Sequence, residues 1–324
     1  MSTELGQLQS YCDDFIASKH AGGIGYARQE IYLRKFLEFC TQYTVSEGLL
    51  SKEIVMAWSA IRGTEDRKTR TGRVTPVRQF AEYLSKRGIP AYVAPKIHGG
   101  NSGFVPYIFT NRELACLFHA ADERRENVGK PNKHYALPMI MRTIYACGLR
   151  RSEVVGLRIC DVNLDDGILT VRNTKFGKDR LIPLHPKFQQ QLREYAAKEL
   201  NGANDSNKPF FPTSTGNFYA GHSVYGAFRK FLDDAGISHG GKDNGPRLHD
   251  LRHTFAVNCL KKWVKDGNDI NAAAPYLAAY LGHTHLRHSQ VYLRLTADMF
   301  PDIVAKIGQK FDVFPIWEGN YEAD

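Results

Sequence analysis

The sequence gives little support for a disulfide framework or a metal-stabilised module. Its cysteines include no Cys-x-x-Cys pair, so neither a zinc module nor a dithiol redox motif is indicated. Scattered cysteines of this kind are typical of reduced, mostly buried small apolar residues. The 324 residues contain six of them: Cys12, Cys40, Cys116, Cys147, Cys160 and Cys259.

Targeting and membrane signals are lacking as well. No basic segment followed by an apolar core stands at the start of the chain, so no signal peptide is expected. No apolar run is long enough to cross a bilayer, so no membrane partner is expected either. The sequence also shows no internal repeat and no low-complexity tract. The lack of a signal peptide and of a membrane-spanning run predicts a cytoplasmic protein.

Acidic residues are in deficit relative to basic ones. The chain has 43 Lys and Arg against 34 Asp and Glu, which gives a net charge of +9. An anionic partner is therefore plausible, although many basic proteins bind no nucleic acid. The hydrophobic fraction of 43% and the charged fraction of 24% are those of a soluble globular protein that is long enough for two domains.

Apolar periodicity predicts a helical first domain over residues 1–95. Helical stripes recur in residues 27–44 and again in residues 74–86. A segment rich in Pro and Gly follows, and we interpret residues 96–106 as an interdomain linker. Residues 107–324 then form the second domain.

The second domain is predicted to be mainly α with a small β-sheet. Thr110 to Glu113 has the spacing of a capping box and predicts the start of a helix. Another helical stripe stops at Gly148, and β-branched or alternating residues predict strands at 168–172 and 180–184. Further helices are expected at residues 187–200, 222–234, 249–262, 272–281 and 289–295.

Short motifs follow one another along this second domain. They read Gly148-Leu149-Arg150-Arg151-Ser152-Glu153, Thr174-Lys175-Phe176-Gly177-Lys178-Asp179-Arg180, His249-Asp250-Leu251-Arg252-His253, Leu281-Gly282-His283 and Tyr292. In this order and spacing they resemble the active site of the tyrosine recombinases, which include phage integrases and Xer proteins. The resemblance covers most of residues 107–300 and implies a helical, SAM-like core-binding domain before a mixed α+β catalytic domain.

Tyrosine chemistry on DNA explains why these residue types would be needed together. A phenol with a pKa of about 10 must lose its proton as it attacks, while charge grows on the phosphate oxygens. Arginine suits that charge because its planar fork holds two oxygens at once. Arg150 and Arg252 are the candidates for this role, and the resemblance makes Tyr292 the nucleophile. A surface salt bridge or a packed helix tyrosine is the alternative for each residue alone.

Histidines are expected to supply further contacts to the phosphate. His249 and Arg252 are three residues apart on a predicted helix, so both can face one phosphate. The resemblance implies that His249 donates a hydrogen bond or shuttles the nucleophile's proton, and that His283 is a second donor. We interpret His253 as structural. Glu153 is expected to orient Arg150.

A general acid is expected on the turn between the two strands. Lysine there can reach into a minor groove and protonate the leaving 5′ oxygen. The motif length favours Lys175, with Lys178 as a phosphate contact or the alternative acid. Thr174 and Phe176 stand where glycines are common in the family.

No metal or other cofactor is expected. His283, His285 and His288 lie close in the sequence, but they lack a helical His-x-x-x-His pair and a nearby cysteine, so a zinc site is disfavoured.

DNA contacts are expected from a basic run in the first domain. The alternative for such a run is a solvated helix face. Next to a DNA-cleaving domain, phosphate contact is favoured. The expected contacts are Arg62, Arg67, Lys68, Arg70, Arg73 and Arg78.

The resemblance therefore predicts a site-specific recombinase of double-stranded DNA with a specific core site. It implies a 3′-phosphotyrosine intermediate, a Holliday junction, and a homo-tetramer or a hetero-tetramer with related recombinases. Two alternatives stay open: a type IB topoisomerase, and an inactive relative kept for DNA binding.

Overall fold

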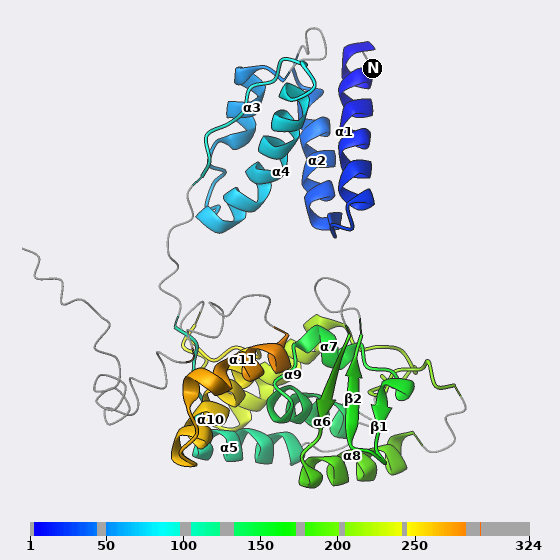
Figure 1. Cartoon of the computed structure of the whole chain (residues 1–324), viewed down its shortest axis with the longest axis vertical. Coiled ribbons are helices and arrows are strands. Elements are labelled where there is room, and N and C mark those ends of the chain that lie inside the picture. The colour runs from blue at the N-terminus through cyan, green and yellow to red at the C-terminus, as the bar shows by residue number, and fades with distance from the viewer. Residues whose placement is uncertain are drawn as a thin grey trace, which may run out of the picture. The chain divides into compact units, whose positions relative to one another are not determined.

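The structure is a computed structural model that describes residues 3–43, 50–97, 105–123, 133–172, 179–200, 205–241, 245–282 and 292. The chain divides into two compact units, Met1–Phe104 and Val105–Asp324 (Figure 1). The division falls inside the segment 96–106 that the sequence marks as a linker.

The first unit is helical in its described part. Its helices are α1 (Thr3–Ala21), α2 (Ala27–Cys40), α3 (Lys52–Ser59) and α4 (Arg67–Ser85). The predicted helix at 74–86 thus begins earlier, because the Asp66 side chain accepts from the Thr69 backbone N at 2.6 Å and caps the helix at Arg67. Phe15, Phe36, Trp58 and Phe80 are buried between these helices and form the centre of the core.

The second unit is mainly helical with one small sheet. Its helices are α5 (Asn111–Asp122), α6 (Lys133–Ala146), α7 (Arg151–Val155), α8 (Pro186–Glu199), α9 (Gly221–Asp234), α10 (Asp250–Lys265) and α11 (Ile270–Leu281), with a short 3-10 turn at Ile159–Asp161. Strands β1 (Val162–Asn163), β2 (Ile168–Val171) and β3 (Arg180–Pro183) pair antiparallel in the order β1-β2-β3. Helix α6 is central and packs on α5, α7, α8, α9 and α10 (Figure 1).

These elements confirm the predicted fold class. The capping box at α5 is present, because the Thr110 hydroxyl accepts from the Glu113 N and the Glu113 carboxylate accepts from the Thr110 N. Both predicted strands form, with Leu169 opposite Ile182. Strand β1 was not predicted, since two residues give no alternation to detect. Apart from Tyr292, the expected helix at 289–295 lies outside the described residues.

Gly148 makes the turn that connects the core helix α6 to the Arg150 motif. Its φ of 57° lies in the left-handed region, which favours glycine. A Cβ at this position would lie 2.4 Å from Cδ1 of Phe255 and 2.9 Å from Cδ2 of Leu281. The Gly148 carbonyl also accepts from Nη1 of Arg252 at 2.7 Å. The turn thus ties the two predicted arginine motifs together.

We expect Gly148→Ala to lower the free energy of unfolding by about 2 to 4 kcal/mol, from left-handed strain and overpacking against Phe255. Urea denaturation measures this. Gly226→Ala is the matched control, because Gly226 lies inside α9 and an added Cβ there meets no atom within 4 Å. Equal stability of the two variants would contradict the role of Gly148.

Candidate active site

Glu153 organises the first arginine motif. Its carboxylate accepts from the backbone N of Arg150 at 2.8 Å and from Nη1 of the same residue at 2.8 Å. Arg150 directly precedes α7, so the carboxylate fixes both the backbone and the side chain at the start of this helix. The expectation that Glu153 orients Arg150 agrees with these contacts.

Arg180, at the start of β3, is a second partner of Glu153 that the sequence analysis did not single out. Its Nη1 and Nη2 donate to the two carboxylate oxygens at 3.0 and 2.8 Å. Arg252 Nη1 lies 3.9 Å from the same carboxylate. Burial alone would raise the pKa of Glu153, but the hydrogen bonds from Arg180 and Arg150 lower it, so the group stays ionised. The carboxylate of Glu153 therefore lies among three guanidinium groups and partly neutralises their charge.

The same three arginines converge on the C-terminal end of α11. The Tyr280 carbonyl accepts from Nε of Arg180 at 3.1 Å. The next two carbonyls, of Leu281 and Gly282, accept from Nη2 of Arg252 at 2.6 Å and Nη2 of Arg150 at 3.0 Å.

These carbonyls lack partners inside the helix and carry its negative dipole end, so cations stabilise them. Gly282 ends α11 in the left-handed conformation, with a φ of 66°. The carbonyls of Leu281 and Gly282, the pair before His283, thus hold Arg252 and Arg150 in position.

Arg252 is buried, with only 1% of its surface exposed. Burial and the neighbouring charge of Arg150 lower its pKa to about 10, so it remains protonated at neutral pH. Its Nη atoms bond to carbonyls, while its Nε is buried without a hydrogen-bond partner. An unused buried N–H on a cation is costly and suits an incoming anion.

Tyr292 comes from the far end of the described chain into this cluster. Its ring is 1% exposed and packs with Leu277 and Leu281 of α11 and with apolar residues of α10. Burial raises the pKa of its phenol, and the charges of Arg252 and Arg150 oppose that shift. The phenol oxygen lies 3.0 Å from Nδ1 of His253. The predicted nucleophile and both predicted arginines therefore meet in one place.

His249 stands immediately before α10, not inside it as predicted, and serves as its N-cap residue. Its ring meets the ring of His253 edge to face, with centroids 4.7 Å apart. Burial, followed by the charges of Arg252 and Arg150, lowers the pKa of His249 to about 4. The imidazole is therefore neutral at pH 7 in the DNA-free protein.

We expect the His249 imidazole to titrate near pH 4 in the free protein and at a higher pH once vanadate, a phosphate mimic, is bound. The bound anion favours the charged imidazolium, so the pKa rises. NMR of labelled histidine measures the change. The His249→Asn variant identifies the signal that responds. A free-state pKa at the ordinary value of about 6.5 would contradict this electrostatic account.

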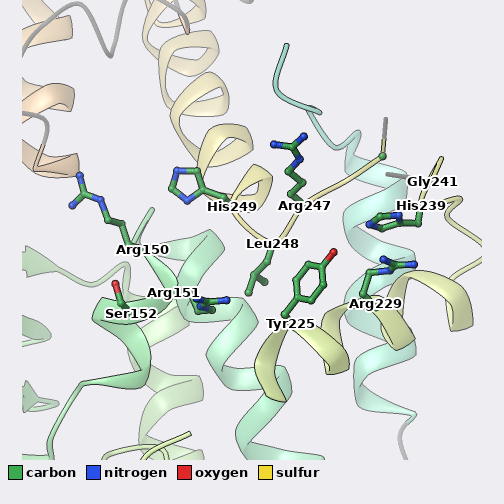
Figure 2. A pocket seen from close by; sticks show the side chains of 11 residues that line it. Arg150, Arg151, Ser152, Tyr225, Arg229, His239, Gly241, Arg247, Leu248 and His249 are labelled. Atoms are coloured by element: carbon green, nitrogen blue, oxygen red, sulfur yellow. The ribbon is translucent and has the colours of Figure 1, made fainter. Parts of the chain in front are cut away.

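A basic cavity of about 690 Å³ opens beside the arginine cluster. Its wall contains Arg150, Arg151, Arg229 and Arg247, and none of the described residues that line it is acidic. Figure 2 shows Arg150 and His249 towards one side of this cavity and Arg229 and His239 towards the other, with Tyr225 and Leu248 between them. Both ring nitrogens of His239 are buried without a hydrogen-bond partner. The four arginines give the cavity next to the Arg150 motif a positive character.

Comparison with known proteins agrees with this geometry. The sequence model of the phage integrase family matches residues 108–299. The y4rE protein of Sinorhizobium fredii, which bears the name integrase/recombinase, is 31% identical over 294 residues, covering 88% of this chain and 91% of that protein. The chain belongs to the phage integrase family of tyrosine recombinases.

A second relative is named as a tyrosine recombinase. The tyrosine recombinase XerC of Pelobacter propionicus is 29% identical over 255 residues, which is 76% of each chain.

Solved structures share the fold of this recombinase. A XerH recombinase bound to a palindromic difH substrate, in a post-cleavage complex, aligns with a TM-score of 0.63 and 17% identity over 94% of this chain and 85% of that one. A lambda integrase dimer bound to a COC′ core site aligns with a TM-score of 0.60 and 16% identity over 88% of this chain and 94% of that one.

Three predicted site residues of the recombinase lie outside the described part of the chain. His283, Lys175 and Lys178 lie outside the described residues, so their roles stay predictions. His285 and His288 lie outside as well, and within the described ranges no three His, Cys, Asp or Glu residues form a group that could hold a metal. No helix in the part of the chain that is described could span a membrane.

One predicted DNA contact requires correction. Arg73 is 4% exposed and donates to Glu65, through Nε at 2.9 Å and Nη2 at 2.6 Å, and to the carbonyls of Trp58 and Ala60. Four of its five N–H groups are thus bound within the first unit, and its role is to hold the loop before α4.

The other members of the basic run differ in their exposure. Arg70 and Arg78 are partly buried and donate to the carbonyls of Ser59 and Ala94. Arg62, Arg67 and Lys68 are exposed at or before the start of α4, so they remain the best candidates for phosphate contact.

Proposed function

We propose that this protein is a site-specific recombinase that cleaves and rejoins duplex DNA through a 3′-phosphotyrosine on Tyr292. The observation that carries the proposal is the position of the Tyr292 hydroxyl, which lies beside Arg252 and Arg150 at the end of α11. A phosphodiester bound to these two cations meets a nucleophile in the same cluster. The covalent intermediate retains the energy of the broken bond, so no nucleotide cofactor is needed.

The arginines act on the charge of the transition state. Arg150 is partly exposed and presents its guanidinium to the basic cavity, whereas the Nε of Arg252 is buried without a hydrogen-bond partner. Their contacts with Glu153 and α11 hold them in position before DNA arrives, so little reorganisation is needed during the reaction. Glu153 and Arg180 are positioning residues in this scheme.

Proton transfer to the leaving group is assigned to the segment of the sequence between β2 and β3. Lys175 is the proposed general acid that protonates the departing 5′ oxygen, with Lys178 as a phosphate contact. His249 and His283 are the proposed hydrogen-bond donors to the bound phosphate. A 5′ hydroxyl of a partner strand then attacks the phosphotyrosine and restores the phosphodiester.

The scissile strand is proposed to continue through the basic cavity. Arg229 and Arg247 would then contact phosphates next to the cleaved one, since phosphate contacts fix the position of a protein on DNA. The exposed Arg62, Arg67 and Lys68 of the first unit would bind the backbone elsewhere on the same core site. The proposed assembly is a tetramer on two sites, either of this chain alone or with related recombinases.

Arg229→Ala is expected to weaken DNA binding and to reduce the slope of log affinity against log salt by about 0.9, the value for one lost phosphate contact. Fluorescence anisotropy over a series of salt concentrations measures both quantities. Lys230→Ala is the matched control, because Lys230 is the next residue on α9, has the same charge and pairs with Asp234 at 3.1 Å. Equal slopes for the two variants would refute the path through the cavity.

Trapping on nicked duplexes tests the function. A nick close to the cleavage site lets the short fragment with the free 5′ hydroxyl diffuse away. Rejoining is then impossible, so a recombinase that has cleaved stays attached to its DNA. We expect SDS-resistant adducts on duplexes drawn from a library that includes DNA flanking the gene. We also expect strand exchange between two such duplexes. Relaxation of any supercoiled plasmid without exchange would instead indicate a topoisomerase.

A further inference from the structure

The imidazole within hydrogen-bond distance of the proposed nucleophile belongs to His253, not to His249. His253 Nδ1 lies 3.0 Å from the Tyr292 oxygen, and the two ring centroids are 5.5 Å apart. The sequence analysis interpreted His253 as structural and expected His249 either to donate a hydrogen bond to the phosphate or to shuttle the proton of the nucleophile. In the structure, the ring of His249, the N-cap residue of α10, packs edge to face against the ring of His253.

We propose that His253 is the general base that removes the proton of Tyr292 during cleavage. This inference rests on the proposed function and adds a catalytic residue to it. The phenol O–H donates to the unprotonated Nδ1, and the proton moves to this nitrogen as the oxygen forms its bond to phosphorus. The bond from phosphorus to the 5′ oxygen breaks, and that oxygen takes a proton from the general acid. In the rejoining step the His253 imidazolium returns its proton to Tyr292.

Charged and titratable groups surround the contact between Tyr292 and His253. The ring of His249 faces the ring of His253 from the start of α10. The positive charges of Arg252 and Arg150 act on the Tyr292 hydroxyl, which contacts His253. These cations favour the phenolate form of Tyr292, whereas burial and the charge of Asp250 oppose it. A bound phosphate adds negative charge, which stabilises the imidazolium formed when the proton moves.

A buried tyrosine in this fold does not require a histidine partner. Tyr195 and Tyr83 also have buried hydroxyl groups, and neither hydroxyl has a hydrogen-bond partner. Apolar packing against α10 and α11 would hold the ring of Tyr292 without His253. The His253 imidazole, 3.0 Å from the Tyr292 oxygen, is therefore better explained by a role in accepting the proton that the nucleophile must lose.

His253→Asn separates proton transfer from simple positioning. The asparagine Oδ1 can accept a hydrogen bond near the position of Nδ1, but it cannot take the proton. We expect single-turnover cleavage at pH 7 to fall by about 10²-fold or more, as for the loss of a general base. The variant's rate should then rise with pH towards the titration of the phenol, whereas the wild-type rate should depend less on pH in the same range. DNA affinity should not change.

A substrate with a 5′-bridging sulfur distinguishes the base from the acid. A thiolate leaves without protonation, so this substrate should rescue Lys175→Ala and leave the defect of His253→Asn in place. His249→Asn is the matched control at the start of the same helix: it should cleave more slowly but keep the wild-type dependence on pH. Added imidazole should partly restore His253→Gly.

The outcomes separate this inference from the proposed function. A His253→Asn enzyme with the wild-type rate and pH dependence, or a defect that the sulfur substrate removes, would overturn the role of His253. If His253→Asn loses DNA binding, His253→Gln is measured in the same way and decides by the same criteria. No adduct from the wild-type protein on any duplex would instead overturn the proposed function itself.

Discussion

Tyr292→Phe is expected to abolish covalent attachment to DNA while leaving DNA binding intact. The change removes one oxygen, and this oxygen is the only atom that could form the phosphotyrosine at this position. The ring of Tyr292 stays packed between α10 and α11, so the fold should lose no more than about 1 kcal/mol for the hydrogen bond to His253. Gel separation of SDS-treated complexes measures the adduct, and anisotropy measures affinity.

Tyr276→Phe is the matched control for this loss. Tyr276 lies on α11 and is 76% exposed, so removing its hydroxyl should change neither adduct formation nor affinity. Adduct formation by Tyr292→Phe at the wild-type level would show that another residue attacks. Loss of adduct in both variants would point to a general effect on α11 and not to the nucleophile.

Arg150→Lys is expected to reduce cleavage by about 10²- to 10³-fold, the usual cost of losing a preorganised group that stabilises transition-state charge. The guanidinium bonds to Glu153 through Nη1 and to the Gly282 carbonyl through Nη2, and it still borders the basic cavity. A single ammonium cannot make both contacts and also present a planar fork to a phosphate. Single-turnover cleavage measures the loss.

Arg158→Lys provides the comparison for the chemistry of the substitution. Its guanidinium donates to Asn207 at 3.3 Å and does not line the basic cavity, so cleavage should not change. Wild-type cleavage by Arg150→Lys would remove this residue from the catalytic set. A fall in DNA affinity that accounts for the whole effect would instead make Arg150 a binding residue.

Local patterns were sufficient to predict much of the fold and part of the site. The capping box at Thr110 and the two strands depend on nearby residues, and each formed close to its expected position. Arg150, Arg252 and Tyr292 were selected by their motifs, and the structure brings them together.

What the sequence did not reveal depends on contacts between distant segments. Arg180 was part of a recognised motif, yet its function follows from its bonds to Glu153 and to the end of α11, which no local pattern reports. His253 was judged by its place in the chain, whereas its importance follows from a contact with Tyr292 across 39 residues.

Arg73 shows the opposite error. Its charge suggested DNA, but the fold buries it against Glu65. In a run of basic residues, burial decides which of them can reach a partner.

Identification of the residue that carries the DNA tests the central claim most directly. A trapped adduct can be digested with nuclease and trypsin, and the remaining nucleotide located by mass spectrometry. Tyr292 falls in the tryptic peptide 288–294, whereas Tyr276 and Tyr280 share the peptide 266–287. We expect the phosphodiester remnant on Tyr292 in peptide 288–294. A remnant on peptide 266–287, or on any residue other than Tyr292, would contradict the proposed nucleophile and the active site built around it.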